Sequence, residues 1–187
     1  MFGTKTKRKT GNDIFAVLLI AIPQLSRLAN GVDPARLLDL IRRHVQNCED
    51  ALRSVNGRIV RSDGDCILAV ISSSDTVHSD SADMSGCGLA VLETAKKTRR
   101  WALENGFKDF AISVTMSQGE CVFEKVGDEY THLFGSPLNR VQALLNRFGQ
   151  EGGLLVIDES LRATCRTDCQ TVGDGAYKLN TVGTDAV

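Results

Sequence analysis

Two groups of polar side chains in this chain are of types that can do chemistry. Arg61 and Asp65 stand on a polar turn between two apolar segments, and His132 and Asn139 flank the start of a later helix pattern. A carboxylate can hold a hard cation, and an arginine can hold phosphate. A turn aspartate, an exposed strand arginine or a loop histidine needs no such role. These residue types alone do not select a function.

The six cysteines show no spacing typical of a disulfide framework. Cys165 and Cys169 form the only close pair, and no histidine stands near them, so they make a poor zinc site. A chain of this size can build its core without disulfides. We therefore expect reduced thiols and a cytoplasmic location.

Length and charge limit the classes of function. The 187 residues suffice for one domain with a real core, and the net charge of −1 gives no bulk attraction to nucleic acid or to an anionic membrane. The apolar run at 14–23 is too short to span a bilayer and lacks a signal-peptide cleavage site. We expect a flexible leader at 1–12, whose basic residues could alternatively form a functional arm, and a single domain at 13–187. Neither nucleic acid nor membrane is an expected partner.

The elements that must position these residues follow from hydrophobic periodicity and turn residues. Asp33-Pro34 and Ser136-Pro137 each predict a helix start, an N-cap followed by proline at the first helical position. Gly57 is expected to end the first of these helices, and a polar loop is expected at 73–86. A further helix is predicted at 89–105, and strands at 14–22, 58–61, 66–72, 107–117, 120–125, 154–157 and 177–182.

The order of these elements is strand, helix, strand, strand, helix, strand, followed by C-terminal additions. This order is typical of the ferredoxin-like plan (βαββαβ), an α+β fold in which helices cover one face of an antiparallel sheet. It does not by itself select a function.

Three segments of the sequence, in this order, resemble the catalytic domain of class III adenylate and guanylate (nucleotidyl) cyclases. The first is LLIAIPQLSRLA at 18–29, similar to the first strand and turn of that family. The second is NGRIVRSDGDCILAVI at 56–71, similar to its central hairpin. The third runs from 126 to 160 and contains FGSPLNRVQALL, and 111–123 adds a weaker match. The related diguanylate cyclases would carry Gly-Gly-(Asp/Glu)-Glu-Phe on the hairpin, and this chain does not.

The resemblance implies a reaction in which the 3′-oxygen of a nucleoside triphosphate attacks the α-phosphorus and expels pyrophosphate. Such a site needs two divalent cations, Mg²⁺ or Mn²⁺, held by paired carboxylates. In the family one aspartate ends the first strand and the other sits in the hairpin. Asp65 falls on the hairpin position, whereas the first-strand position falls on Ala21. Half of the metal-binding pair is therefore expected to be missing.

The resemblance also implies a helix that carries an asparagine for the ribose and, four residues later, an arginine for the phosphate transition state. Asn139 matches the asparagine, but the arginine position falls on Ala143. Arg140 and Arg147 are close in sequence. Either could replace the missing arginine only if its side chain reached the phosphate from a different position. The base-selecting positions fall on Arg61 and His132, which allow no choice between ATP and GTP.

These matches predict a catalytically degenerate cyclase homologue that acts in signal transduction as a homodimer, or as a heterodimer with another cyclase domain. Residual binding of ATP or GTP is possible, with Mg²⁺ or Mn²⁺ only if the nucleotide binds. The alternative is a divergent active cyclase that makes cAMP or cGMP with a relocated arginine. A nucleotide-binding module without chemistry, and an unrelated function on the same sheet, are two further readings.

Overall fold

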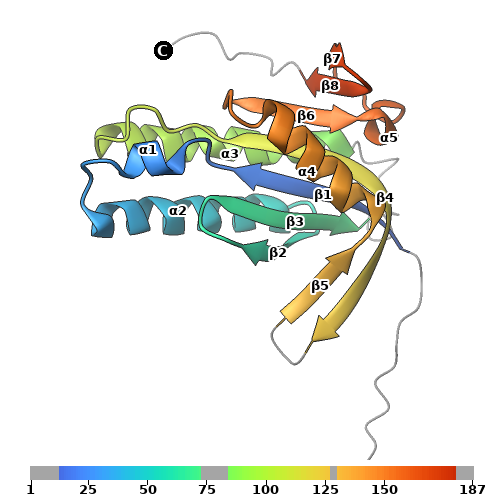
Figure 1. Ribbon diagram of the computed structural model, residues 1–187, viewed down its shortest axis with the longest axis horizontal. Coiled ribbons are helices and arrows are strands. Elements are labelled where there is room, and N and C mark those ends of the chain that lie inside the picture. The colour runs from blue at the N-terminus through green and yellow to red at the C-terminus, as the bar shows by residue number, and fades with distance from the viewer. Residues whose placement is uncertain (1–12, 73–83, 127–129, 180–187) are drawn as a thin grey trace, which may run out of the picture.

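The structure, a computed structural model, is described for residues 13–72, 84–126 and 130–179 (Figure 1). The expected leader at 1–12 and most of the expected loop, residues 73–83, lie outside the described residues, as do residues 180–187. The helices are α1 Leu25–Ala29, α2 Pro34–Arg53, α3 Met84–Glu104, α4 Ser136–Phe148 and α5 Glu159–Arg162. The strands are β1 Asp13–Ala21, β2 Gly57–Ser62, β3 Cys66–Ser72, β4 Ser113–Val126, β5 Tyr130–Phe134, β6 Leu154–Asp158, β7 Cys169–Gly173 and β8 Ala176–Leu179.

An open eight-stranded sheet organises the fold, and its order is β2-β3-β1-β4-β6-β8-β7, with β5 paired to β4. Strand β1 is antiparallel to both of its neighbours, β3 and β4. The order β2-β3-β1-β4 and the connections β1-α2-β2-β3-α3-β4 confirm the expected α+β plan. The C-terminal additions extend the sheet, since β6 pairs with β4 in parallel and the β7–β8 hairpin follows.

Two hydrophobic cores lie on opposite faces of this sheet. On one face, buried residues of α2 and α3 such as Leu40 and Val91 pack against Leu18 of β1. On the other face, Val141 of α4 packs against Val17 and Leu19. Figure 1 shows α4 in front of the sheet and α2 and α3 behind it. Because both faces are covered, residues 15–20 of β1 are all buried, as its continuous apolar run indicates.

Strand β4 corrects the prediction of two strands at 107–117 and 120–125. Residues 107–112 instead connect α3 to β4, with Phe107 and Phe110 buried as anchors. The chain then stays extended through Gly119, where a Cβ atom would lie 3.0 Å from Cγ of Pro137 in α4. This glycine therefore permits close approach of a helix and does not form a turn, and the actual partner strand is β5.

Several predicted boundaries also differ from the structure. Helix α2 ends at Arg53, and Gly57 is the first residue of β2. Helix α3 begins at Met84, so the end of the expected loop at 73–86 is helical. Gly135 is the N-cap of α4, because Ser136 already lies in the first turn and its hydroxyl accepts a hydrogen bond from Arg140. The short elements α1, α5 and β7 have no counterpart in the sequence-based prediction.

Helix α3 lies close to the sheet because of one glycine. A Cβ atom on Gly88 would lie 2.2 Å from Sδ of Met116 and 3.0 Å from the Leu155 methyl carbons, whereas a Cβ atom on Gly86 would meet nothing within 4 Å. Met116 and Leu155 are fully buried in a packed core, which leaves them little room to move. Within the described residues, none of the helices is both long and apolar enough to cross a membrane.

The two glycines of α3 allow a matched test of this packing. We expect Gly88→Ala to lower the free energy of unfolding by about 1–3 kcal/mol through overpacking. Gly86→Ala should instead raise it by about 0.5–1 kcal/mol, because alanine is the better helix former in open space. Urea denaturation of both variants measures the difference. Equal effects of the two substitutions would show that α3 does not approach the sheet this closely.

Candidate functional site

One group of candidate residues meets where β1 ends. Ala21 pairs with Cys66 of β3 and with Ser113 of β4. The backbone N–H of Ile22 donates to the carbonyl oxygen of Asp65 at 2.8 Å. Ala21 and Asp65 are therefore neighbours in space although 44 positions separate them in sequence (65 − 21).

The β2–β3 turn that carries Asp65 is held by its own hydrogen bonds and by an ion pair. Gly64 adopts a φ of 81°, and the N–H of Asp63 donates to the carbonyl oxygen of Cys66 at 2.9 Å. Nε of Arg61 lies 2.7 Å from Oδ2 of Asp63, with both side chains largely exposed. The Asp65 side chain is exposed as well. One carboxylate of the turn thus already has a cationic partner within the hairpin.

Cys66 follows Asp65 and is half-buried between β1 and β2. Burial first, and then the carboxylates of Asp65 and Asp63, raise the pKa of its thiol to about 11. The thiol is therefore neutral at pH 7 and is a weak ligand for a hard cation such as Mg²⁺.

A second group of candidate residues lies on α4. Asn139 and Ala143 are both exposed and are four residues apart, so they share one face of the helix. Val141, between them in sequence, is buried against the sheet, and the hydroxyl of Thr115 in β4 donates to its carbonyl oxygen at 3.1 Å. The exposed face of α4 therefore presents an amide at Asn139 and only a methyl group at Ala143.

The third group is His132, which lies on β5. Strand β5 and the end of β4 form an arm, residues 122–126 and 130–134, that projects from the main sheet (Figure 1). His132 is exposed, and its ring stacks on Phe134 with centroids 6.1 Å apart.

The register of β1 and β4 places these groups at opposite ends of the sheet. Ala21 pairs with Ser113 at one end of β1, and Asp13 pairs with Cys121 at the other, beside the arm. Eight residue steps of strand separate the two ends, a distance of roughly 26 Å. Asp65 and Arg61 are near the first end, whereas His132 and the first turn of α4 are near the second. A single chain does not bring all of the predicted site residues together.

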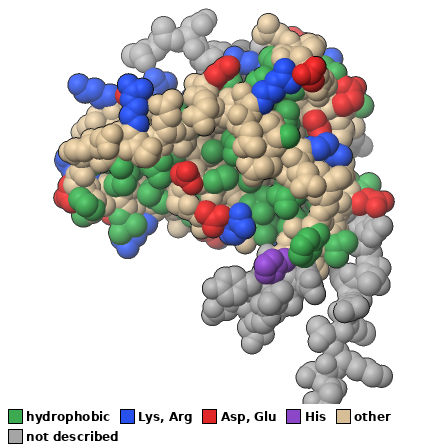
Figure 2. All heavy atoms as spheres, viewed as in Figure 1, with side chains coloured by type: hydrophobic (Ala, Val, Ile, Leu, Met, Phe, Trp, Pro, Cys, Tyr) green, Lys and Arg blue, Asp and Glu red, His purple; other side chains and the backbone are tan. Residues whose placement is uncertain are grey.

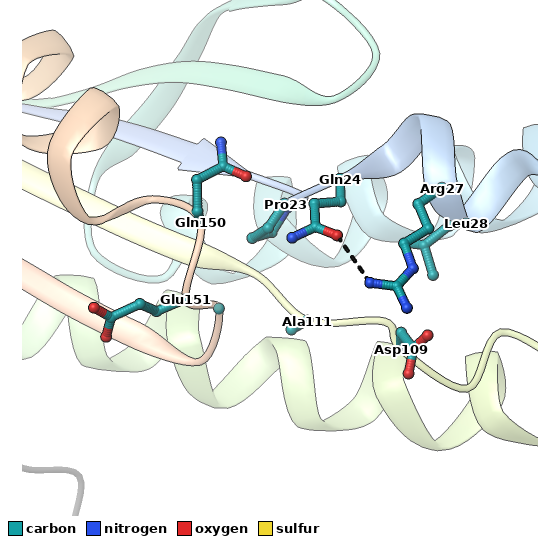
Figure 3. A pocket seen from close by; sticks show the side chains of 9 residues that line it. Pro23, Gln24, Arg27, Leu28, Asp109, Ala111, Gln150 and Glu151 are labelled. Atoms are coloured by element: carbon teal, nitrogen blue, oxygen red, sulfur yellow. Dashed lines mark hydrogen bonds between the residues drawn. The ribbon is translucent and has the colours of Figure 1, made fainter.

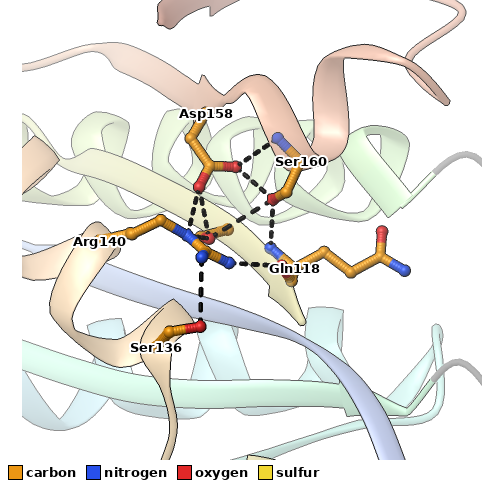
Figure 4. A network of polar contacts seen from close by, with 6 residues as sticks. Gln118, Ser136, Arg140, Asp158 and Ser160 are labelled. Atoms are coloured by element: carbon orange, nitrogen blue, oxygen red, sulfur yellow. Dashed lines mark hydrogen bonds and ion pairs between the residues drawn. The ribbon is translucent and has the colours of Figure 1, made fainter. Parts of the chain in front are cut away.

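A polar cluster that the sequence did not predict fixes α4 to the sheet (Figure 4). Nε of Arg140 lies 2.8 Å from Oδ2 of Asp158, a buried residue at the end of β6. The hydroxyl of Ser117 donates to the same Asp158 oxygen at 2.6 Å, and Nη2 of Arg140 donates to the carbonyl oxygen of Gln118 at 2.7 Å. Ser160 adds its N–H and its hydroxyl to Oδ1 of Asp158. Both oxygen atoms of the Asp158 carboxylate therefore already have polar partners.

Arg147, the other arginine near the Ala143 position, is also engaged. Its Nη1 lies 2.6 Å from Oδ2 of Asp174 in the β7–β8 turn, and its guanidinium covers the ring of Phe148. The structure thus gives each of the two arginines a carboxylate partner of its own.

Asp158 ends an apolar strand, and nothing in its sequence context distinguished it from an ordinary strand-end residue.

The donor groups at the end of β1 do not fit a two-metal centre. Such a centre requires carboxylates arranged to share two cations. Here Asp65 offers one exposed carboxylate, Asp63 is paired with Arg61, and Ala21 offers no ligand atom. In the part of the chain that the structure describes, three or more histidine, cysteine or acidic side chains nowhere gather as a metal-binding group would.

Comparisons with known proteins agree with the fold. The family model described as adenylate and guanylate cyclase catalytic domain matches residues 8–184. No curated protein matches the sequence. Among solved structures, the adenylyl cyclase CyaB from P. aeruginosa is similar with a TM-score of 0.79 and 17% identity, covering 94% of this chain and 97% of that one.

Two further solved structures are also similar. The non-canonical dimeric guanylyl cyclase domain of the RhoGC fusion protein from Blastocladiella emersonii has a TM-score of 0.74 and 14% identity, and the match covers 90% of this chain and 94% of that one. The guanylate cyclase domain of RhGC from Catenaria anguillulae, in complex with GTP, has a TM-score of 0.70 and 13% identity, with 89% and 94% covered. At these identities the likeness shows the fold alone.

The contributions of the two arginine–aspartate pairs of α4 to the free energy of unfolding can be compared. We expect Asp158→Asn to lower the free energy of unfolding by about 2–4 kcal/mol, because it leaves a partly buried guanidinium and two hydroxyl donors without their charged acceptor. Asp174→Asn, at an exposed pair, should change it by less than about 1 kcal/mol. Chemical denaturation of both variants tests this. Similar losses would mean that the buried cluster does not anchor α4.

Proposed function

Because this chain belongs to the adenylate and guanylate cyclase catalytic domain family, we propose that it is a catalytically degenerate member that acts in signal transduction by associating with a second cyclase domain. The observation that carries the proposal is the position of Ala21. It lies beside Asp65 at the end of β1, where the family resemblance requires the second carboxylate of the metal-binding pair. The missing carboxylate is therefore the one that would have to share the cations with Asp65.

The remaining carboxylates do not restore this pair. Asp63 is neutralised by Arg61 in the same hairpin, and Asp33 is the N-cap of α2, where its side chain accepts from the N–H of Ala35. A two-cation site with a single free carboxylate would bind metal weakly, because the charge of the ligands sets the affinity for a hard cation. We therefore infer no reaction step that requires the metals.

The engagement of the two neighbouring arginines supports the same proposal. Arg140 would have to leave the carboxylate of Asp158 and the carbonyl oxygen of Gln118 before it could reach a phosphate. Arg147 would have to leave Asp174. Catalytic side chains that act as a unit fail together when members are lost, so the absence of arginine at 143 and of a carboxylate at 21 leaves little basis for turnover.

The separation of the candidate residues supports association with a second chain. Asp65 and Arg61 lie near one end of β1, and His132 and Asn139 lie toward the other. If a second domain docks head to tail, the Asp65 end of one chain faces the His132 end of its partner. A nucleotide, ATP or GTP, would then contact Arg61 and Asp65 of one chain and Asn139 of the other. Residual nucleotide binding without chemistry is part of this proposal.

The projecting arm offers an apolar surface for this contact. Val122 and Phe134 are directly paired across β4 and β5, so they share one face of the arm. Each is 53% exposed, unusually high for a pair of large apolar side chains. Figure 2 shows hydrophobic side chains gathered near the base of the arm. The cysteines form no disulfide in the structure, which fits the reducing cytoplasm as the place of action.

The catalytic part of the proposal is tested by an assay for cyclic nucleotide with ATP and GTP, in Mn²⁺ and in Mg²⁺. We expect no turnover by the wild-type chain. The double variant Ala21→Asp with Ala143→Arg should make cyclic nucleotide at a rate at least about 100-fold above the wild-type background, since each restored group is worth that much in comparable sites.

Gln142 provides the matched control for this assay. Gln142 is exposed and next to Ala143, but it points in a different direction around the helix. The variant Ala21→Asp with Gln142→Arg therefore carries the same charges and should stay inactive. Turnover by the wild-type chain would contradict the proposal and favour the divergent active cyclase, with its arginine and metal ligand still to be found.

Association is tested by sedimentation equilibrium of the wild-type chain, alone and with an active cyclase domain. We expect the double variant Val122→Ser with Phe134→Ser to weaken the dimer at least about tenfold, a loss of about 1.4 kcal/mol of binding free energy. Leu38→Ser, which changes another exposed large apolar residue, on α2, is the control and should leave the dimer intact. A wild-type chain that stays monomeric and binds no cyclase domain would refute this part of the proposal.

A further inference from the structure

A small pocket opens beside the end of β1, between α1, the segment before β4 and the loop before β6 (Figure 3). Its volume is about 260 Å³. Pro23 and Leu28 lie on one side of it and Ala111 on another, and these supply apolar surface. The pocket begins two residues after Ala21, but it contains none of the candidate residues for nucleotide binding.

Two opposite charges face this pocket without pairing. Arg27 and Asp109 both line the pocket, and Figure 3 shows them toward one end of it, while the Glu151 carboxylate points away. Within the described residues, neither an ion pair nor a hydrogen bond joins Arg27 to Asp109. Nη1 of Arg27 donates to Oε1 of Gln24 at 3.4 Å, a long hydrogen bond to a neutral acceptor.

The backbone on two sides of the pocket adopts left-handed conformations. Gln24 has a φ of 54°, which is uncommon for a residue other than glycine and costs about 1 kcal/mol or more. On the opposite wall Gly152 has a φ of 67°, and a Cβ atom there would lie 2.8 Å from Cβ of Ala111. The loop before β6 can therefore approach Ala111 this closely because residue 152 is glycine and carries no Cβ atom.

We propose that this pocket binds a free amino acid, or an equally small zwitterion. The ligand carboxylate would bind the fork of the Arg27 guanidinium, and its ammonium group would bind Asp109. A molecule that carries both charges satisfies both side chains at once, whereas an anion would meet the Asp109 carboxylate and a cation would meet Arg27. The apolar surface of Leu28 and Ala111 would receive part of the ligand side chain.

The size of the pocket decides against a nucleotide as its occupant. Pockets for drug-sized ligands measure roughly 300–1,000 Å³, and this one lies below that range. The inference is also independent of the proposed loss of catalysis, since it uses neither Ala21 nor any residue of α4. Its failure would leave the proposed function unchanged.

Thermal unfolding of the full chain with each standard amino acid at millimolar concentration tests the inference. We expect at least one amino acid to raise the Tm saturably, by roughly 5–10 °C at about 100 times its Kd. The matching carboxylic acid without the ammonium group, and the matching amine without the carboxylate, should give much smaller shifts. Inorganic pyrophosphate should give none.

Paired variants locate the binding site. Arg27→Gln and Asp109→Asn should each weaken binding at least about tenfold by calorimetric titration. The exposed residues Arg36 and Asp39 on α2 provide matched controls as Arg36→Gln and Asp39→Asn, which should bind like the wild-type chain. The inference is wrong if no amino acid shifts the Tm, if pyrophosphate or a singly charged analogue stabilises equally well, or if the shift persists in both pocket variants.

Discussion

The rest of the structure depends on the burial of β1 between β3 and β4. Its residues from Phe15 to Ile20 are buried, with α2 and α3 packed on one face and α4 on the other. A strand covered on both faces must be apolar along its length, and polar candidate residues can then lie only beyond its ends. Asp65 at one end and the arm at the other are therefore kept about 26 Å apart by the core itself. This spacing is why association enters the proposed function.

The fold and the expected chemistry are separable in this chain. Helix α4 is anchored by the ion pair of its Arg140 with Asp158 of β6, and by Val141 in the second core. Asn139 and Ala143 lie on the exposed side and contribute little to that packing. Likewise, the Arg61–Asp63 ion pair balances charge in the β2–β3 turn without a cation. An alanine at position 143 costs the fold little, because that position is exposed on α4.

Sequence patterns predicted the central elements because their causes are local. The apolar run of β1 and the Asp33-Pro34 helix start needed no tertiary information, and both are confirmed. The errors arose where contacts between residues far apart in sequence determine the structure. The break predicted between strands at 107–117 and 120–125 lies inside β4, where Gly119 permits the approach of Pro137. In α2 the buried stripe includes His44, whose pKa is lowered by burial to about 4, while the more hydrophobic Leu38 stays exposed. The Asp158 cluster and the pocket at Arg27 join segments far apart in sequence, so no local pattern could predict them.

The incomplete metal-binding pair is the central claim, and counting bound Mn²⁺ by electron paramagnetic resonance tests it most directly. The wild-type chain would be titrated with Mn²⁺ in the presence of a non-hydrolysable ATP analogue, with Ala21→Asp measured beside it. Because Ala21 leaves Asp65 without the second carboxylate of the pair, we predict at most one tightly bound ion per site in the wild-type chain and a second one in the variant. Two tightly bound ions per wild-type active site would contradict the claim.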